Sequence, residues 1–154
     1  TFGHLTRSAL LEEIFSNYDG PPPDVNLFNE KNHGNAILKL NNEGLLESVH
    51  DISSGGMLIA AAEMTINSGI GLQINKPKKY TNNFEYLFGE DQGRYLIEVE
   101  SDNVKKVKTF LNDNEVFNET IGYTQNKKFS VFQDFNLDVD KLRYLNNTWY
   151  YKNL

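Results

Sequence analysis

Apolar side chains recur at helical spacing through the first 45 residues of the chain. A leading helix is predicted over residues 5–15, whose apolar positions are Leu10, Leu11, Ile14 and Phe15. A second helix is predicted over residues 26–42, with Gly44 as its C-terminal cap. The string YDGPPPDVN lies between them, and its three consecutive prolines restrict φ and remove donors. This string therefore predicts an extended connector.

Strand and helix patterns alternate in the middle of the chain. LLESVHDI, residues 45–52, predicts a strand, and MLIAAAEMTI, residues 57–66, predicts a helix that ends before Gly69. Because this helix is apolar almost throughout, we expect it to be buried on most sides. GIGLQINK reads as a further strand, NNFEYLFGED as a short helix or turn, and GRYLIEVES as the clearest strand of the chain.

The last third of the chain predicts a helix, a hairpin and a closing helix. DNVKKVKTFLNDN is typical of an amphipathic helix capped by Asp102, with an inward face of Val104, Val107, Phe110 and Leu111. VFNETIGYTQNKKFSVFQDF predicts a hairpin that turns near Gln125 and Asn126. Residues 139–154 predict a helix with an aromatic end.

These elements together predict an α+β fold. Alternating strands and helices favour a mixed sheet covered by helices, and the late hairpin argues against a purely parallel sheet. We expect a largely antiparallel sheet in one domain, residues 1–154, of which residues 1–25 form the leading helix and the proline connector.

Composition narrows the function classes. Hydrophobic residues make up 39% and charged residues 23% of the 154 positions, as in ordinary globular domains. The net charge of −6 argues against nucleic acid as the main partner, since phosphate backbones are bound by clustered Lys and Arg. The absence of cysteine excludes disulfides and thiolate sites.

No apolar run is long enough to span a membrane and no signal peptide is recognisable, so a cytoplasmic location is expected. The first residue, Thr1, suggests a processed chain or an excised fragment.

The string HDISSGG, residues 50–56, joins a predicted strand to a predicted helix. Ser53 or Ser54 could cap the helix, while Gly55 and Gly56 would let backbone N–H groups approach a ligand. A helix N-terminus also attracts phosphate. The string alone leaves both a capped turn and a phosphate loop open. His50 and Asp51 adjoin on a strand, which predicts opposite faces and no acid–base pair.

A second polar string, FGEDQGR, precedes the clearest strand. It gathers Glu90, Asp91, Gln92 and Arg94, which fit either a surface turn with an Arg–Glu pair or a ligand loop at a sheet end. The three histidines lack metal-ligand spacing, and there is no GxSxG string for a serine hydrolase. No catalytic residue and no metal ligand is therefore predicted from these residues.

Several strings, taken in order, resemble one enzyme family. HDISSGGMLIAAAEMTINSGIG is similar to the HD-[IV]-SDGG-L segment of phosphoribosylformylglycinamidine synthase. GHLTRS, DGPPPDVNL, LFGEDQGRYLIEV and IGY occur in the order of that family's last domain, and LRYLNNTWYYKNL resembles the closing helix of its small bacterial form. The resemblance covers essentially the whole chain and implies the fold of the C-terminal domain of aminoimidazole ribonucleotide synthetase.

The resemblance also implies a function. The family uses ATP, magnesium and glutamine-derived ammonia to convert formylglycinamide ribonucleotide to formylglycinamidine ribonucleotide in purine synthesis. Its small form works with a glutaminase subunit and a small bridging subunit. This chain would be the last domain, inactive without the other domains of the synthase. The alternatives are another ATP-dependent enzyme of the same superfamily, and a non-catalytic module that binds a nucleotide, a phosphate or a protein.

For individual residues the resemblance implies little chemistry. The family's catalytic histidine and its ATP and magnesium ligands lie in earlier domains, so no residue here corresponds to them. By analogy with the first half of the enzyme, Glu90, Asp91 and Gln92 would face a phosphate or nucleotide pocket together with the Ser53–Gly56 loop. Departures from the family pattern are Ser54 in place of Asp, Met57 in place of Leu, and Thr6 and Arg7 in place of Gly and Gln.

Overall fold

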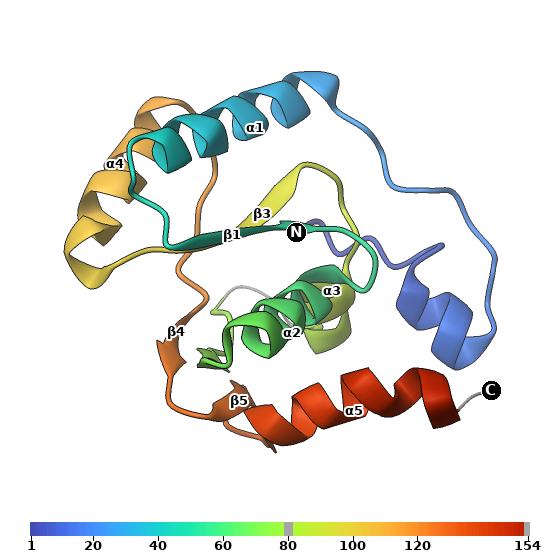
Figure 1. The fold of residues 1–154 in the computed structure, drawn as a ribbon. Coiled ribbons are helices and arrows are strands. Elements are labelled where there is room, and N and C mark those ends of the chain that lie inside the picture. The colour runs from blue at the N-terminus through green and yellow to red at the C-terminus, as the bar shows by residue number, and fades with distance from the viewer. Residues whose placement is uncertain (79–81, 153–154) are drawn as a thin grey trace. The chain divides into compact units, whose positions relative to one another are not determined.

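The computed structural model describes residues 1–78 and 82–152, which divide into two compact units. The first unit comprises residues 1–60 and 82–119, and the second comprises residues 61–81 and 120–154. Helix α2 (Gly56–Ser68) begins in the first unit and continues into the second. Figure 1 labels the elements of both. The prediction of one domain over residues 1–154 stays a prediction.

The first unit combines an antiparallel strand pair with five helical elements of short or medium length, besides the start of α2. Strand β1 (Ser48–Ile52) pairs with β3 (Arg94–Glu98), so that His50 lies opposite Leu96. The helical elements are the π-helical turn η1 (Leu10–Ile14), α1 (Leu27–Asn42), α3 (Asn83–Phe88), the 3₁₀ turn η2 (Ser101–Asn103) and α4 (Val104–Asp113).

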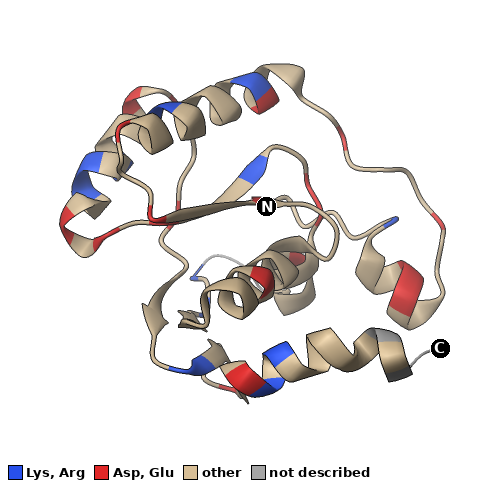
Figure 2. Cartoon of the chain, in the orientation of Figure 1, with Lys and Arg blue, Asp and Glu red and all other residues tan. Residues whose placement is uncertain are grey.

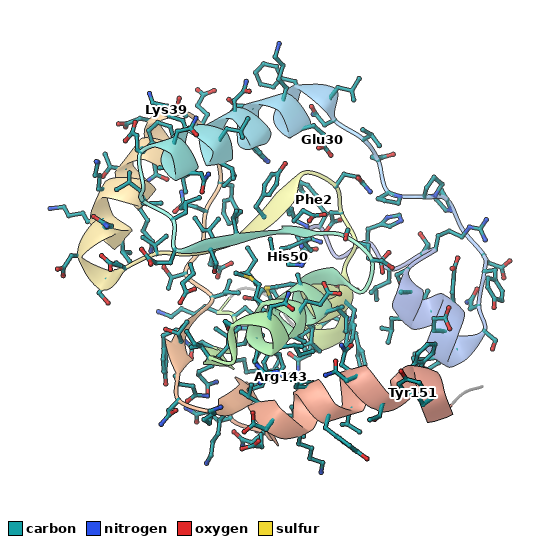
Figure 3. All side chains as sticks on the ribbon, viewed as in Figure 1. Phe2, Glu30, Lys39, His50, Arg143 and Tyr151 are labelled. Atoms are coloured by element: carbon teal, nitrogen blue, oxygen red, sulfur yellow. The ribbon has the colours of Figure 1, made fainter. Side chains whose placement is uncertain are left out.

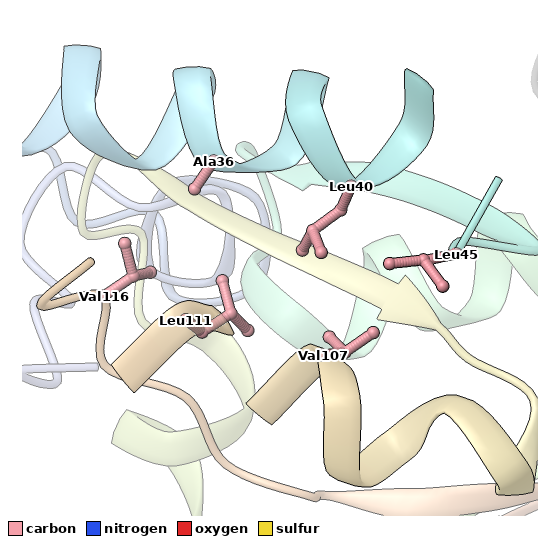
Figure 4. Packing of buried hydrophobic residues seen from close by; sticks show 6 residues of the cluster. All are labelled: Ala36, Leu40, Leu45, Val107, Leu111 and Val116. Atoms are coloured by element: carbon pink, nitrogen blue, oxygen red, sulfur yellow. The ribbon is translucent and has the colours of Figure 1, made fainter. Parts of the chain in front are cut away.

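The apolar core of the first unit lies between α1, α4 and the strand pair (Figure 4). Leu40 is fully buried at its centre, in contact with side chains that come from α1, α4 and the segments that follow them. Ile97 and Val99 pack against this cluster from β3 and the residue after it. The members of the buried cluster are Ala36, Leu40, Leu45, Val107, Leu111 and Val116.

Helix α1 has capping interactions at both ends. The Asn26 side chain accepts a hydrogen bond from the backbone N–H of Asn29 (3.0 Å), which satisfies a free donor of the first turn. At the other end Gly44 adopts φ +66°, and its N–H donates to the carbonyl of Asn41 while that of Leu45 donates to Leu40. This is the Schellman arrangement, and it confirms Gly44 as the residue that ends the helix.

The second unit contains a four-stranded sheet and the closing helix. The strands are β2 (Gly71–Ile74), β4 (Gly122–Gln125), β5 (Lys128–Val131) and β6 (Phe135–Asp138), in the order β4-β2-β5-β6. Strand β2 runs antiparallel to β4 and parallel to β5, while β5 and β6 are antiparallel. Helix α5 (Val139–Lys152) follows β6 directly. The α+β class with mixed, largely antiparallel pairing is confirmed, although the strands form two sheets and not one.

The predicted hairpin near Gln125 is wrong. The chain does turn there, but β2 lies between β4 and β5, so those two strands do not pair with each other. The hairpin of this region is formed one strand later by β5 and β6. Its turn places Phe132 and Gln133 at φ +56° and +67°, the left-handed conformations that suit the twist of paired strands. A side-chain pattern cannot reveal a strand inserted from 50 residues away.

Several helix predictions need smaller corrections. The leading helix is confined to a short turn around η1 and does not begin at Leu5. Asp102 does not cap α4, because it lies within the 3₁₀ turn that precedes it. Helix α2 is not buried on most sides: Met57, Ala60, Ala61 and Thr65 are buried, but Ile59 is 40% exposed. The closing helix ends at Lys152, and residues 153–154 of its predicted range lie outside the described part.

Both signs of charge occur along α1 and α4 (Figure 2). Within the described ranges, 1–78 and 82–152, no helix is both long and apolar enough to cross a membrane.

Candidate functional site

The loop Ser53–Gly56 makes a tight turn before α2. The backbone N–H of Gly56 donates to the carbonyl of Ser53 (3.0 Å), and Gly55 and Gly56 have φ +82° and +68°. Positive φ at two successive positions strongly favours glycine at both, because glycine lacks a Cβ. Helix α2 begins at Gly56, and that Ser53 or Ser54 caps it stays a prediction. Ser53 and Ser54 are exposed at the tip of the turn.

Gly56 also lets two backbone segments come into close contact. A Cβ at this position would lie 2.6 Å from the carbonyl carbon and 2.7 Å from the Cα of Phe88. It would lie 2.9 Å from the carbonyl oxygen of Gly89. The loop is therefore packed directly against the end of α3, immediately before Glu90.

Glu90 is hydrogen-bonded to two distant backbone segments. Its Oε1 accepts from the N–H of Gly55 (2.7 Å) and from the N–H of Ala9 (2.8 Å). Its own N–H donates to the carbonyl of His4 (2.9 Å). The carboxylate thus occupies a position beside the first turn of α2, where the helix dipole favours negative charge.

Asp91 receives its hydrogen bonds from the start of the chain. Its Oδ2 accepts from the N–H of Phe2 (3.0 Å) and from the hydroxyl of Thr1, and its Oδ1 accepts from the N–H of His4 (3.3 Å). The guanidinium of Arg94 lies 3.8 Å from Asp91 Oδ2, and Arg94 Nε donates to the Asp91 carbonyl (3.0 Å). Asp91 is 8% exposed, so these contacts replace nearly all of its water.

The surroundings of Asp91 favour its charged form. Burial alone would raise the pKa of this carboxyl. The hydrogen bond from Thr1, the positive charge of Arg94 and the backbone donors of His4 and Phe2 outweigh burial, so the pKa of Asp91 lies below its ordinary value. Asp91 is therefore an ionised structural acceptor at neutral pH.

The predicted site residues are only partly brought together. The loop Ser53–Gly56 and Glu90 are in contact, Asp91 is buried next to Glu90, and Gln92 is exposed. The prediction of an Arg–Glu pair is wrong, because Arg94 lies against Asp91. That these seven residues neighbour a phosphate or nucleotide stays a prediction. Sequence reasoning missed Ala9 and the Thr1–His4 segment, whose contribution is made mainly by backbone N–H groups that carry no side-chain signal.

The histidines use their ring nitrogens on backbone carbonyls. His4 contacts Pro21 O (3.2 Å), His33 contacts Gly93 O (2.8 Å) and His50 contacts Asp51 O (2.6 Å). His50 Nδ1 also lies 3.7 Å from Asp51 Oδ1, but burial alternates along β1, with His50 partly buried and Asp51 exposed, as expected for side chains on opposite faces. Figure 3 labels His50 on β1. In the part of the chain that the structure describes, no three His, Asp or Glu side chains form a group that could hold a metal ion.

Comparison with known proteins identifies similar sequences. Residues 4–134 match the family described as AIR synthase related protein, C-terminal domain. The chain is 38% identical over 149 residues to the phosphoribosylformylglycinamidine synthase subunit PurL of Pelagibacter ubique, and 36% identical to that of Rhodopseudomonas palustris strain HaA2. Each match covers 97% of this chain and 20% of the relative. The chain thus spans one fifth of the length of these curated relatives.

Solved structures show the same fold. Phosphoribosylformylglycinamidine synthase II from Thermotoga maritima is similar over 92% of this chain and 24% of its own, with a TM-score of 0.69 and 19% identity. The Thermotoga maritima PurL complexed with ATP is similar over 91% of this chain and 24% of its own, with a TM-score of 0.66 and 19% identity. These similarities support the α+β fold class that the sequence predicts.

Proposed function

This chain belongs to the family described as AIR synthase related protein, C-terminal domain, and we propose that it is the last domain of a phosphoribosylformylglycinamidine synthase. The whole enzyme converts formylglycinamide ribonucleotide to formylglycinamidine ribonucleotide, with ATP and glutamine-derived ammonia. One observation carries the proposal: the alignment runs through 97% of the chain to a PurL subunit at 38% identity.

In this proposal the chain supplies structure and not chemistry. The two acidic side chains of its most polar turn, Glu90 and Asp91, are engaged by backbone donors and by Arg94. ATP and its magnesium are held by residues outside this chain. Solved relatives complexed with ATP, ADP and AMPPCP support nucleotide binding by the longer enzyme.

The proposed partners are the remaining domains of the synthase, a glutaminase subunit and a small bridging subunit. A Thermotoga maritima relative described as PurLQS, with a TM-score of 0.67, supports an enzyme made of several subunits.

A domain exchange tests the proposal. The matched fifth of the Pelagibacter ubique PurL would be replaced by this chain, and the hybrid expressed in bacteria that lack their own synthase. We expect growth without added purine, whereas the parent truncated before the matched region gives none. A hybrid that accumulates as folded protein but supports no growth would count against the proposal.

The isolated chain provides the complementary assay. Incubated with formylglycinamide ribonucleotide, ATP, magnesium and ammonia, it is expected to form no product. Turnover by the isolated chain would contradict the assignment of the chemistry to other domains.

A further inference from the structure

Residues 1–9 lie along the turn that contains Glu90 and Asp91, and both carboxylates accept hydrogen bonds from backbone N–H groups of this segment. We propose that this segment, here called the N-terminal strap, is a separately releasable element whose attachment Glu90 couples to the Ser53–Gly56 loop. The inference depends on contacts within the first unit alone and goes beyond the proposed enzymatic function.

The attachment has two points. Asp91 accepts hydrogen bonds from Phe2 and His4 at the start of the strap, and Glu90 accepts one from Ala9 at its end. The N–H of Glu90 adds a third contact, to the carbonyl of His4 (2.9 Å). Each carboxylate is therefore a charged acceptor for strap donors, and hydrogen bonds to charged groups are stronger than neutral ones.

A single oxygen couples the strap to the loop. Glu90 Oε1 accepts from Ala9 at 2.8 Å and from Gly55 at 2.7 Å, so both donors depend on one side-chain position. If the strap leaves, Glu90 loses a partner that fixes its rotamer, and the Gly55 hydrogen bond weakens with it. Residues that share a partner in this way have coupled free energies.

The strap is held in a conformation that it would not favour when released. Gly3 has φ +76° and Arg7 has φ +60°, and a left-handed conformation at a residue other than glycine is unfavourable. A Cβ at Gly3 would lie 2.8 Å from the Cβ of Glu85, so the strap also packs closely on α3. Arg7 is also held by its side chain, whose Nη1 donates to the carbonyl of Tyr18 (2.6 Å), so the contacts of the attached strap offset the cost of this backbone conformation.

Hydrogen exchange of individual amides, followed by NMR on the full chain, tests the coupling. In Glu90→Ala we expect the exchange rates of Ala9 and Gly55 to rise together by at least tenfold. Amides of β1 and α4 should keep their rates. Glu90→Gln retains an acceptor oxygen and is expected to restore part of the protection at both amides. In Asp91→Ala the largest rise should be at Phe2 and His4.

Asp102→Ala is the matched control, because Asp102 is an exposed carboxylate of the same unit, in the 3₁₀ turn before α4. It should leave the exchange of Ala9 and Gly55 unchanged. A rise at Gly55 with Ala9 unchanged would overturn the coupling. Faster exchange throughout the first unit in both Glu90 variants would overturn the claim that the strap is separately releasable.

Discussion

Gly56→Ala tests whether the glycines of the Ser53–Gly56 loop are required by close backbone packing. Gly44→Ala is a matched control, because the two glycines have almost the same φ, +68° and +66°. They differ in their surroundings. A Cβ at Gly44 meets nothing within 4 Å, whereas a Cβ at Gly56 meets three backbone atoms of Phe88 and Gly89 at 2.6–2.9 Å.

The difference in contacts sets the expected magnitudes. A left-handed alanine costs about 1–2 kcal/mol, partly offset by a reduced entropy of the unfolded chain worth about 0.4–1 kcal/mol. We therefore expect Gly44→Ala to lower the free energy of unfolding by about 1 kcal/mol. Gly56→Ala adds an overlap with backbone that cannot rotate away, and forced overpacking costs about 1–3 kcal/mol. Its expected loss is about 2–4 kcal/mol.

Urea unfolding of both variants and the parent, followed by far-ultraviolet circular dichroism, measures these losses. The m-values of the three proteins should agree, so that the shifts in midpoint report stability. If Gly56→Ala lowers the free energy of unfolding no more than Gly44→Ala does, close packing against Phe88 and Gly89 does not require glycine at this position, and the argument is refuted.

Three further predictions concern the core, the acidic turn and the end of α2. Leu40→Ala should lower the free energy of unfolding by about 3 kcal/mol in the same assay, since a fully buried leucine leaves a cavity; a loss under about 1 kcal/mol would contradict its place in the core. Asp91 has a lowered pKa when folded, so its stabilisation is present above its unfolded pKa of about 3.9 and is lost as the pH falls through the folded value. The stability difference between the parent and Asp91→Asn should therefore be constant from pH 7 to 5 and shrink below pH 4, and a pH-independent difference would refute this. Arg143, labelled on α5 in Figure 3, donates from Nε (3.1 Å) and Nη2 (2.8 Å) to the carbonyl of Ile66 near the end of α2. In thermal unfolding, Arg143→Ala should lower the free energy of unfolding by about 1–2 kcal/mol. Lys127→Ala, which removes only an exposed ion pair, should lower it by under about 0.5 kcal/mol. Equal losses would contradict the role of Arg143 at the end of α2.

The elements that local patterns predicted well are those stabilised by neighbours in sequence. Helix α1 could be read from its apolar spacing and from Gly44, because the N-cap and the Schellman hydrogen bonds join residues within one turn. Strands β1 and β3 follow from the alternation of apolar and polar residues, although each pairs with a strand far away in sequence. The helix after the glycines ends at the predicted place, where Gly69 has φ +74°.

The elements that were predicted wrongly depend on partners far away in the chain. The sequence pattern correctly predicts a turn between β4 and β5. The two strands do not pair, because β2 lies between them. Apart from Arg94, the partners of Glu90 and Asp91 lie 35 to 90 residues away and are mainly backbone N–H groups. No periodicity or motif marks such donors, which is why the sequence favours a surface turn here and leaves a ligand loop open as the alternative.

The most direct test of the central proposal is the kcat/KM of the purified hybrid synthase, in which this chain replaces the matched fifth of the Pelagibacter ubique PurL. Formylglycinamidine ribonucleotide formation would be measured with ATP, magnesium and ammonia, beside the parent enzyme and the truncated parent. We predict a kcat/KM within about tenfold of the parent, a difference of about 1.4 kcal/mol in transition-state stabilisation. A folded hybrid with no more activity than the truncated parent would contradict the proposal that this chain is the last domain of such a synthase.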